Sequence, residues 1–325
     1  MSATTALDPA PVARFRRDLA ELIDLERDAV LVALSGGPDS VALLLLTHAV
    51  LGERCRAATV DHGLRAASAD EARAAAALCA RFGIAHIALT APLPARVGRT
   101  ANLSARARAL RYRLLGEHAG DAWIATGHHS DDQLETLIMR LNRGAGVGGL
   151  AGIRHRSGRT IRPLLGWRHS ELAALVASVG IRPADDPSNR DDRFDRARLR
   201  KVLAGADWLD RARIGTSVAA LAQADEALHW AAAGLAEARI TEDDAGIALD
   251  PAGLPEELVR RLVVQCLGRV LPDVEVRGPA VAALTAALHR GEAGELAGVK
   301  AVARGGTRPR FVFTLAPPRR GTRPA

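Results

Sequence analysis

Residues 35–40 read Ser-Gly-Gly-Pro-Asp-Ser, and this hexapeptide decides how the rest of the chain is interpreted. It follows the apolar run 30–34 and precedes an apolar helical stretch, so the pattern predicts a strand–loop–helix unit. The two glycines permit a tight turn whose N–H groups point into one concavity, and the proline suits a first helical turn. Because a helix N-terminus adds partial positive charge, the loop is predicted to bind phosphate groups. The residues expected to line it are Ser35, Gly36, Gly37, Pro38, Asp39 and Ser40.

The aspartate of this loop is its unusual member, because a carboxylate repels phosphate unless a cation lies between them. We therefore expect Asp39 to bind Mg²⁺, a cation that prefers oxygen ligands. The loop lacks the Gly-Lys-Ser/Thr ending of a Walker A motif, and no lysine lies nearby. The plain alternative is a Gly-Gly turn with a capping aspartate, which the strand-to-helix context disfavours.

Working outward from the loop, residues 30–180 alternate between short apolar runs and helical stretches. Such alternation predicts an α/β fold with a doubly wound parallel sheet, whose strand carboxyl ends meet at one ligand-binding edge. The expected strands are 30–34, 57–60, 86–89, 123–126 and 160–164, and the expected helices are 40–51, 68–82, 102–117, 131–141 and 169–179.

Beyond residue 187 the pattern changes, and a long Ala-rich helix is expected over 206–240. Helices over 256–270 and 279–289 and strands over 296–303 and 310–315 complete a smaller α+β domain. We therefore expect three parts: a catalytic domain over 1–206, a connecting helix over 207–240 and a small domain over 241–325.

The second polar cluster, Gly-His-His-Ser-Asp-Asp-Gln-Leu-Glu-Thr over 127–136, lies where the fourth expected strand ends. Its carboxylates Asp131, Asp132 and Glu135 crowd a helix start, where they need a cation or an arginine as partner. A structural zinc site is disfavoured because no cysteine and no second ligand pair accompany the cluster. The nearby Gly144-x-Gly146-x-x-Gly149 matches a dinucleotide fingerprint but follows a helix, so we interpret it as an active-site loop.

Composition limits the classes of protein. The chain has 325 residues, of which 48% are hydrophobic and 25% charged, and its net charge is +7. It has no apolar run long enough to span a bilayer, and its acidic, proline-containing start is unlike a secretory signal. Its 3 cysteines are far apart, which excludes a disulfide scaffold. We therefore expect a cytoplasmic protein with no membrane contact. Its charge indicates either a polyanionic partner or the arginine-rich surface of a soluble enzyme, and with such a partner the basic end over 300–325 is expected to contact backbone phosphates.

Several segments in a fixed order carry a family resemblance. Taken with the loop, the order and spacing of these segments resemble the tRNA(Ile)-lysidine synthetase family of PP-loop (N-type) ATP pyrophosphatases, over residues 28–203. Two positions depart from the family pattern: Ala197 stands where an asparagine is usual, and Pro183-Ala184 where an aromatic is usual. The segments are 60–65, 105–112, 128–136, 148–152, 162–165, 186–189 and 196–201.

The resemblance implies a reaction in two steps. ATP adenylates the ring carbonyl oxygen of the wobble cytidine in the CAU anticodon of tRNA(Ile), releasing pyrophosphate. The ε-amino group of free L-lysine then displaces AMP and leaves lysidine. The partners are thus tRNA(Ile), ATP with Mg²⁺ and lysine, the 241–325 domain is expected to bind the tRNA, and the oligomeric state, a homodimer included, is left open.

The resemblance also implies residue roles. Asp39 and Asp132 would position Mg²⁺, and His62 would contact the nucleotide. Arg108 and Arg111, at i and i+3 of one helix, would clamp the α-phosphate, or else pair with a neighbouring helix. His129 would be the base that accepts a proton from lysine, while Asp131 or Glu135 could instead bind the lysine ammonium.

Two enzymatic alternatives and one binding function are weighed against this interpretation. A thiolating PP-loop enzyme would need reactive cysteines, and Cys55, Cys79 and Cys266 stand at no motif. An amide-forming synthetase would explain the loop but not the 105–112 and 186–189 segments. A non-catalytic RNA-binding protein would not need carboxylates at a phosphate site, because they repel RNA.

Overall fold

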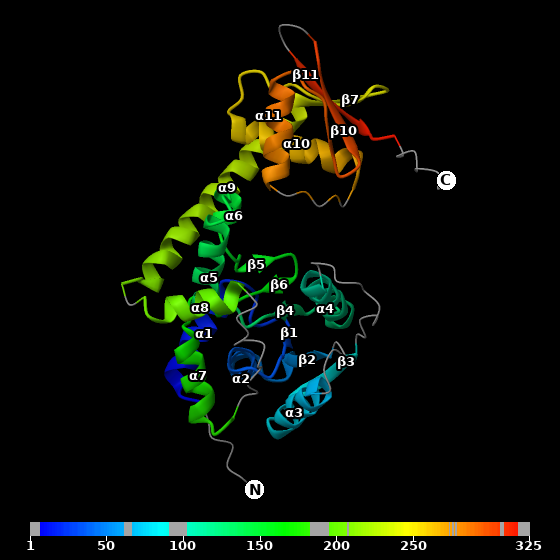
Figure 1. The fold of residues 1–325 in the computed structure, drawn as a ribbon. Coiled ribbons are helices and arrows are strands. Elements are labelled where there is room, and N and C mark those ends of the chain that lie inside the picture. Colours follow the sequence, from blue (N-terminus) through cyan, green and yellow to red (C-terminus); the bar gives the residue numbers. More distant parts are fainter. Residues whose placement is uncertain are drawn as a thin grey trace, which may run out of the picture. The chain divides into compact units, whose positions relative to one another are not determined.

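The computed structural model describes residues 7–61, 67–90, 103–182, 195–206, 208–272, 274, 276, 278–305 and 309–317. The chain forms two compact units (Figure 1). The first unit comprises residues 1–139 and 152–217, and the second comprises residues 140–151 and 218–325. Among the described residues, no helix is both long and apolar enough to cross a membrane.

The first unit is built on a 6-stranded sheet with the order β3-β2-β1-β4-β6-β5. All neighbours pair in parallel except β5, which is antiparallel to β6. The chain winds outward in both directions from β1, which confirms the expected doubly wound parallel sheet and brings the carboxyl ends of β1 and β4 side by side. The strands are β1 (Val30–Ala33), β2 (Cys55–Asp61), β3 (Ala85–Thr90), β4 (Trp123–Ala125), β5 (Arg156–Ser157) and β6 (Thr160–Ile161).

Helices cover both faces of this sheet. Val30 and Val32 point to one face, where they pack with the buried side chains of α1, α2, α3 and α7. Leu31 points to the other face and packs with Leu115 of α4. The helix α2 is apolar on nearly all sides because its neighbours enclose it. The helices of this unit are α1 (Pro9–Ala20), α2 (Pro38–Leu51), α3 (Ala67–Arg81), α4 (Leu103–Ala119), α7 (His169–Ser178) and α8 (Asp195–Ala204).

The second unit contains a 5-stranded antiparallel sheet with the order β7-β8-β11-β10-β9. Helices α10 and α11 supply Leu262 and Leu288 to a core that contains Phe311 and Phe313 of the sheet. The expected α+β character is confirmed, although the β7–β8 hairpin and β9 were not predicted. The elements are β7 (Ile240–Asp243), β8 (Gly246–Leu249), α10 (Glu256–Val270), α11 (Gly278–His289), β9 (Gly294–Leu296), β10 (Val299–Arg304) and β11 (Arg310–Leu315).

Two helices belong to both units. The helix α5 (Ser130–Leu141) begins in the first unit, and its last residues join the second, together with the short helix α6 (Val147–Leu150). The helix α9 (Arg211–Arg239) likewise begins in the first unit and ends in the second. A Cβ atom at Gly148 would lie 2.8 Å from Oδ1 of Asp225 on α9, so this close approach requires a glycine. The glycine-rich segment interpreted as an active-site loop therefore packs within the second unit.

Candidate active site

The 35–40 loop follows β1 and closes on itself through its serines. The N–H of Ser35 donates to Oγ of Ser40 over 3.2 Å, and Ser35 Oγ lies 3.1 Å from the same oxygen. Ser40 Oγ in turn donates to the carbonyl of Gly37 over 3.0 Å. Gly36 has a φ of 85°, a value that favours glycine. The hexapeptide therefore forms a closed turn at the start of α2, in the context from which phosphate binding was predicted.

The second polar segment lies directly against this loop. A Cβ atom at Gly127 would lie 3.0 Å from the carbonyl carbon of Asp39 and 3.1 Å from the nitrogen of Ser40. Any other residue would force these two backbones apart, because backbone atoms cannot give way as a flexible side chain can. Since β1 and β4 are parallel neighbours, the two segments meet at the carboxyl edge of the sheet although they are far apart in the sequence.

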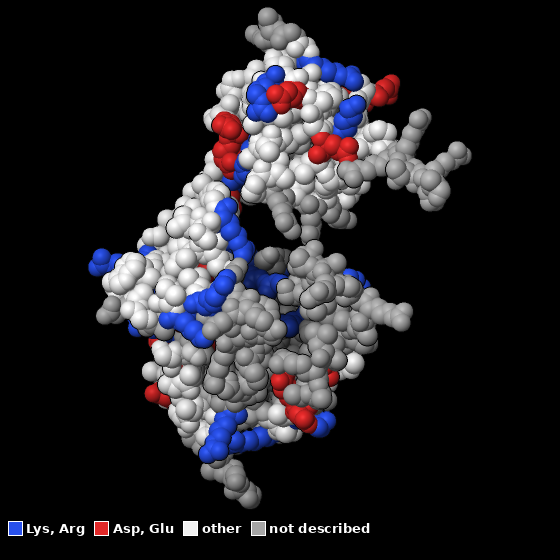
Figure 2. Space-filling view, in the orientation of Figure 1, with Lys and Arg blue, Asp and Glu red and all other residues white. Residues whose placement is uncertain are grey.

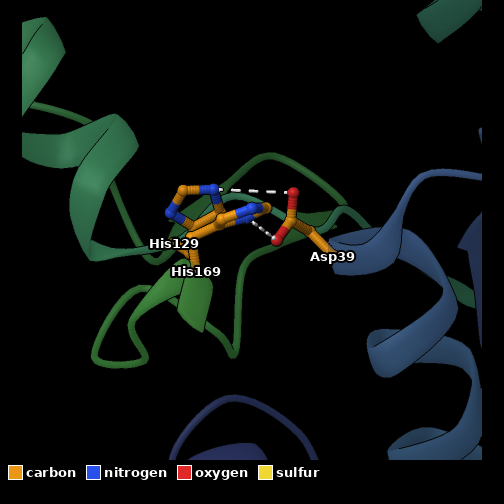
Figure 3. Close-up of side chains that lie close together, drawn as sticks. All are labelled: Asp39, His129 and His169. Carbon is orange, nitrogen blue, oxygen red and sulfur yellow. Dashed lines mark hydrogen bonds and ion pairs between the residues drawn. The ribbon is translucent and has the colours of Figure 1, made fainter. Parts of the chain in front are cut away.

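Five side chains gather at this contact, and we call them the Asp39 cluster. The buried ring of His129 lies at its centre. Nε2 of His129 is 3.6 Å from Asp39 Oδ2 and 3.5 Å from Asp132 Oδ2, and Nδ1 is 3.5 Å from Asp131 Oδ2. His169 approaches from the start of α7, and its Nδ1 lies 2.8 Å from Asp39 Oδ1 (Figure 3). The members of the cluster are Asp39, His129, Asp131, Asp132 and His169.

The cluster shifts the pKa values of its members strongly. Burial by itself would lower the pKa of His129, but the carboxylates of Asp131, Asp39 and Asp132 outweigh it and raise the pKa to about 10. Burial by itself would raise the pKa of Asp39, but His129 and His169 outweigh it and lower the pKa to about 2. The imidazolium of His129 also holds the pKa of Asp131 below its usual range. At neutral pH, His129 is therefore a cation between carboxylate anions.

Two arginines complete the charge balance. Arg200 of α8 binds Glu135 with both sides of its guanidinium, over 2.7 Å and 3.1 Å, and Glu135 is only 2% exposed. Arg211 at the start of α9 donates to Asp131 over 2.6 Å, and the backbone N–H of His169 donates to the same carboxylate over 2.9 Å. Glu135 and Asp131 are therefore each bonded to an arginine. The ring of His129, in contrast, lies further from its three neighbouring carboxylates than a good hydrogen bond allows.

The chain is similar in sequence to proteins of one family. Residues 11–206 match the PP-loop domain family. Over 323 residues the chain is 44% identical to a tRNA(Ile)-lysidine synthase from Novosphingobium aromaticivorans, and the match covers 95% of each chain. The chain belongs to the tRNA(Ile)-lysidine synthase family. A second family member, from Zymomonas mobilis, is 38% identical over 300 residues and is matched over 89% of each chain.

The fold of this chain also resembles that of a solved structure. The U34-tRNA thiolase NcsA from Methanococcus maripaludis, solved with its 4Fe-4S cluster, superposes with a TM-score of 0.53 and 18% identity. The match covers 67% of this chain and 79% of that chain. At this level of identity the likeness shows a shared fold and carries no inference about chemistry.

The structure places only part of the residue set that the family resemblance implied. Asp39, Asp132 and His129 meet in the Asp39 cluster, and the whole 35–40 loop adjoins it. Arg108 instead contacts Tyr112 of its own helix, with Nη2 3.3 Å from the hydroxyl. Arg111 lies on the same helix, where burial lowers its pKa. His62, the 186–189 segment and the Pro183-Ala184 departure lie outside the described residues.

Three residues of the site, His169, Arg200 and Arg211, were not predicted from the sequence of this lysidine synthase family member. His169 follows the 162–165 segment, and that position before a helix was the only sequence signal for it. Its placement depends on α1, which the sequence analysis also missed: Arg14 stacks on Trp167 at 4.1 Å and donates to the carbonyl of Gly166 over 2.7 Å. Arg200 and Arg211 were part of an arginine-rich stretch that sequence alone could not resolve into individual partners.

None of the three cysteines belongs to the segments that form this site. Cys55, Cys79 and Cys266 are all buried and free. Burial raises the pKa of Cys55 to about 12, that of Cys79 to about 11 and that of Cys266 to about 12. Thiols with such pKa values stay protonated at neutral pH and are poor nucleophiles and poor ligands.

Proposed function

We propose that this chain ligates lysine to the wobble cytidine of the CAU anticodon of tRNA(Ile). In the first step the C2 carbonyl oxygen of cytidine attacks the α-phosphate of ATP, and pyrophosphate leaves. In the second step the ε-amino group of lysine attacks C2, and AMP leaves with the former carbonyl oxygen. The products are lysidine, AMP and pyrophosphate.

One observation carries the proposal: the 35–40 loop and the 127–136 segment meet through Gly127 at one sheet edge. Each segment alone has an ordinary structural explanation. Together they put the 35–40 turn and the start of α2 beside several carboxylates, and this is an arrangement suited to a nucleotide phosphate with a cation. The long matches to relatives named tRNA(Ile)-lysidine synthase support the choice of substrate.

The carboxylates of the Asp39 cluster fit Mg²⁺. Asp39 and Asp132 each present an oxygen to the same nitrogen of His129, at 3.6 Å and 3.5 Å, so both can serve one cation. Oxygen ligands from carboxylates, completed by phosphate and water, are what Mg²⁺ prefers. Bound there, Mg²⁺ would offset the charge that builds up on the phosphates. The hydroxyls and N–H groups of the 35–40 loop would hold the pyrophosphate portion.

The environment of His129 changes the role expected for it. With a pKa raised to about 10, its ring is already protonated at neutral pH and cannot accept a proton from lysine. The base role expected from the resemblance therefore does not suit this geometry. We assign His129 instead to positioning: its cation holds the carboxylates of Asp39 and Asp132 in place. Glu135 pairs with Arg200 and Asp131 pairs with Arg211, so either carboxylate would have to give up its arginine to bind the lysine ammonium.

Basic side chains outside the Asp39 cluster would contact the nucleotide and the phosphates of the tRNA. Arg108 and Arg111 would grip the α-phosphate or the leaving AMP, and His62 the nucleotide. Figure 2 shows basic side chains gathered over α8, whose described side chains include Arg198, Arg200 and Lys201. These charges suit the phosphates of an RNA. The mixed charges visible on the second unit in the same view give less support to the tRNA contact expected there. Action on tRNA would place the protein in the cytoplasm.

The experiment is mass spectrometry of a tRNA(Ile) transcript after incubation with the chain, ATP, Mg²⁺ and lysine. We expect a mass gain of one lysine less one water, confined to the anticodon cytidine, with one AMP formed per gain. A transcript whose wobble cytidine is changed to uridine is the control and should stay unmodified. In a parallel incubation with sulfide in place of lysine, replacement of oxygen by sulfur would favour thiolation. An unmodified wild-type transcript in the lysine incubation would contradict the proposal.

A further inference from the structure

Three members of the Asp39 cluster have the composition of a transition-metal site. Asp39, His129 and His169 each offer one ligand atom, and these atoms all lie within 4.8 Å of one another. Figure 3 shows both imidazole rings turned toward the carboxylate of Asp39. The three residues come from α2, from the end of β4 and from the start of α7, so the fold and not one flexible segment brings them together.

The separations between the atoms match a small coordination sphere. The Nδ1 of His169 is 2.8 Å from one oxygen of Asp39, and the Nε2 of His129 is 3.6 Å from the other. In a tetrahedral site with bonds of about 2.0–2.1 Å, neighbouring ligand atoms are separated by about 3.3 Å. These two distances fall on either side of this value, and the ring nitrogens of His129 and His169 lie within 4.8 Å of each other, so rotations of the two rings would bring all three ligands onto one ion.

The long distances around the buried His129 ring are a second observation that points to a bound cation. The residue is only 4% exposed, yet its Nε2, the nitrogen that faces Asp39, has carboxylate oxygens no closer than 3.5 Å. A buried polar ring normally has a hydrogen-bond partner at a shorter distance. His169, in contrast, is half exposed, so solvent can reach the cluster and supply a fourth ligand.

The ligand set separates this site from the Mg²⁺ site proposed above. Two imidazole nitrogens and one carboxylate suit Zn²⁺ and similar borderline cations, whereas Mg²⁺ takes oxygen ligands almost exclusively. We propose that Asp39, His129 and His169 bind Zn²⁺, with solvent at the fourth position and with the proton on the ligating nitrogen of His129 released to solvent as the ion binds. Because Asp39 belongs to both sites, zinc occupancy would remove a ligand from Mg²⁺ and hold the enzyme inactive. The zinc site itself rests on geometry alone and does not require the proposed tRNA chemistry.

The test is calorimetric titration of the full chain, stripped with EDTA and dialysed, with ZnCl₂ in the absence of ATP, tRNA and Mg²⁺. We expect one saturable zinc per chain. His169→Ala should weaken binding at least about tenfold, because it removes a ligand atom. His169→Gln serves as the second variant if the alanine change lowers the thermal midpoint. The matched control is His118→Ala, an exposed histidine on α4, which should bind zinc as the wild type does.

The outcomes are separable from those of the ligation assay because no substrate is present. Absence of saturable zinc binding to the wild-type chain would overturn the proposal. So would equal affinity in the wild type and in both His169 variants, since zinc would then be bound elsewhere. The buried thiols of Cys55, Cys79 and Cys266 are not competing ligands in the folded chain.

Discussion

The two units of the molecule each contain a cluster of charged side chains, and the clusters differ in how completely they are bonded. In the second unit, Arg261 is 5% exposed and donates to Asp225 over 2.6 Å and to Glu257 over 2.8 Å. It also lies 2.6 Å from Nδ1 of His229. We call these four residues the Arg261 network. In the first unit the central cation, His129, lies 3.5 Å or more from each of its three carboxylates.

The difference separates a structural cluster from a binding cluster. In the Arg261 network a central guanidinium has short, charge-assisted bonds, so the network stabilises the packing of α9 against α10. In the Asp39 cluster the central ring lacks such bonds: Asp39 is bonded to His169 and Asp131 to Arg211, while His129 lies 3.5 Å or more from all three carboxylates. Incomplete bonding of this kind leaves ligand atoms available to a cation. The comparison therefore predicts that substitutions in the first unit change chemistry, while those in the second change stability.

The largest expected effect is on stability, from Asp225→Ala. The change would leave the guanidinium of Arg261 buried without its closest anion, and breaking a buried pair costs about 3–5 kcal/mol. Urea unfolding followed by circular dichroism measures this loss. Glu242→Ala, at an exposed glutamate on β7, is the control and should unfold like the wild type. A loss for Asp225→Ala no larger than the control's would break the comparison.

The next effect is on chemistry, from Asp39→Asn. The change keeps the size of the side chain and removes its charge, so AMP formation should fall by about 10²–10³-fold, as on loss of a transition-state contact. The urea midpoint should move less than in Asp225→Ala. Asp70→Asn, on the exposed side of α3, is the control in the tRNA-dependent AMP assay. Near-normal AMP formation by Asp39→Asn with Mg²⁺ present would remove this aspartate from the mechanism.

A smaller effect is expected where the two site segments touch. Gly127→Ala puts a methyl group 3.0 Å from the backbone of Asp39, so the loop must shift and the variant should lose about 1–3 kcal/mol of stability. AMP formation should fall together with it. Gly116→Ala is the control, because its Cβ meets nothing within 4 Å in the interior of α4. Full activity in Gly127→Ala would mean that the loop tolerates displacement.

A further expected effect is a pH dependence of the free energy of unfolding. The folded pKa of His129 is raised from 6.5 to about 10, so its contribution to stability is fully present below pH 6.5. That contribution is lost as the pH rises through about 10. His129→Gln should therefore flatten the decline of the urea midpoint across this range, whereas His118→Gln should not. Identical pH profiles for the wild type and His129→Gln would show that the ring is neutral in the folded chain.

The elements that the sequence predicted well are those with strong local periodicity. The strands that precede the polar loops, the helix α10 and the strand β11 all have apolar patterns that depend little on distant contacts. The helix α1 and the β7–β8 hairpin were missed because their patterns are short, and their stability comes from packing against distant segments. The hairpin strand β8, for example, pairs with β11, and its Ile247 and Leu249 pack in a core that α10 and α11 also form.

The same distinction applies to the candidate site. Asp39, His129 and Asp132 could be identified because they lie in segments with a recognisable order. His169 could not, because its approach to Asp39 depends on how α1 holds the chain before α7. The protonation of His129 could not be predicted either, since it depends on three carboxylates whose distances only the folded chain fixes. Sequence thus identified residues within motifs, and the fold was needed for their partners.

The excursion of residues 140–151 into the second unit has a consequence for how this protein can be divided. A chain cut after residue 217 would retain Gly148 but lose Asp225, against which that glycine packs. The shortened protein would carry an exposed glycine-rich loop in place of an ordered one. Exchanging C-terminal portions between relatives would meet the same obstacle at this contact. A chimaera that preserves it must therefore take its 140–151 segment and its α9 from the same parent.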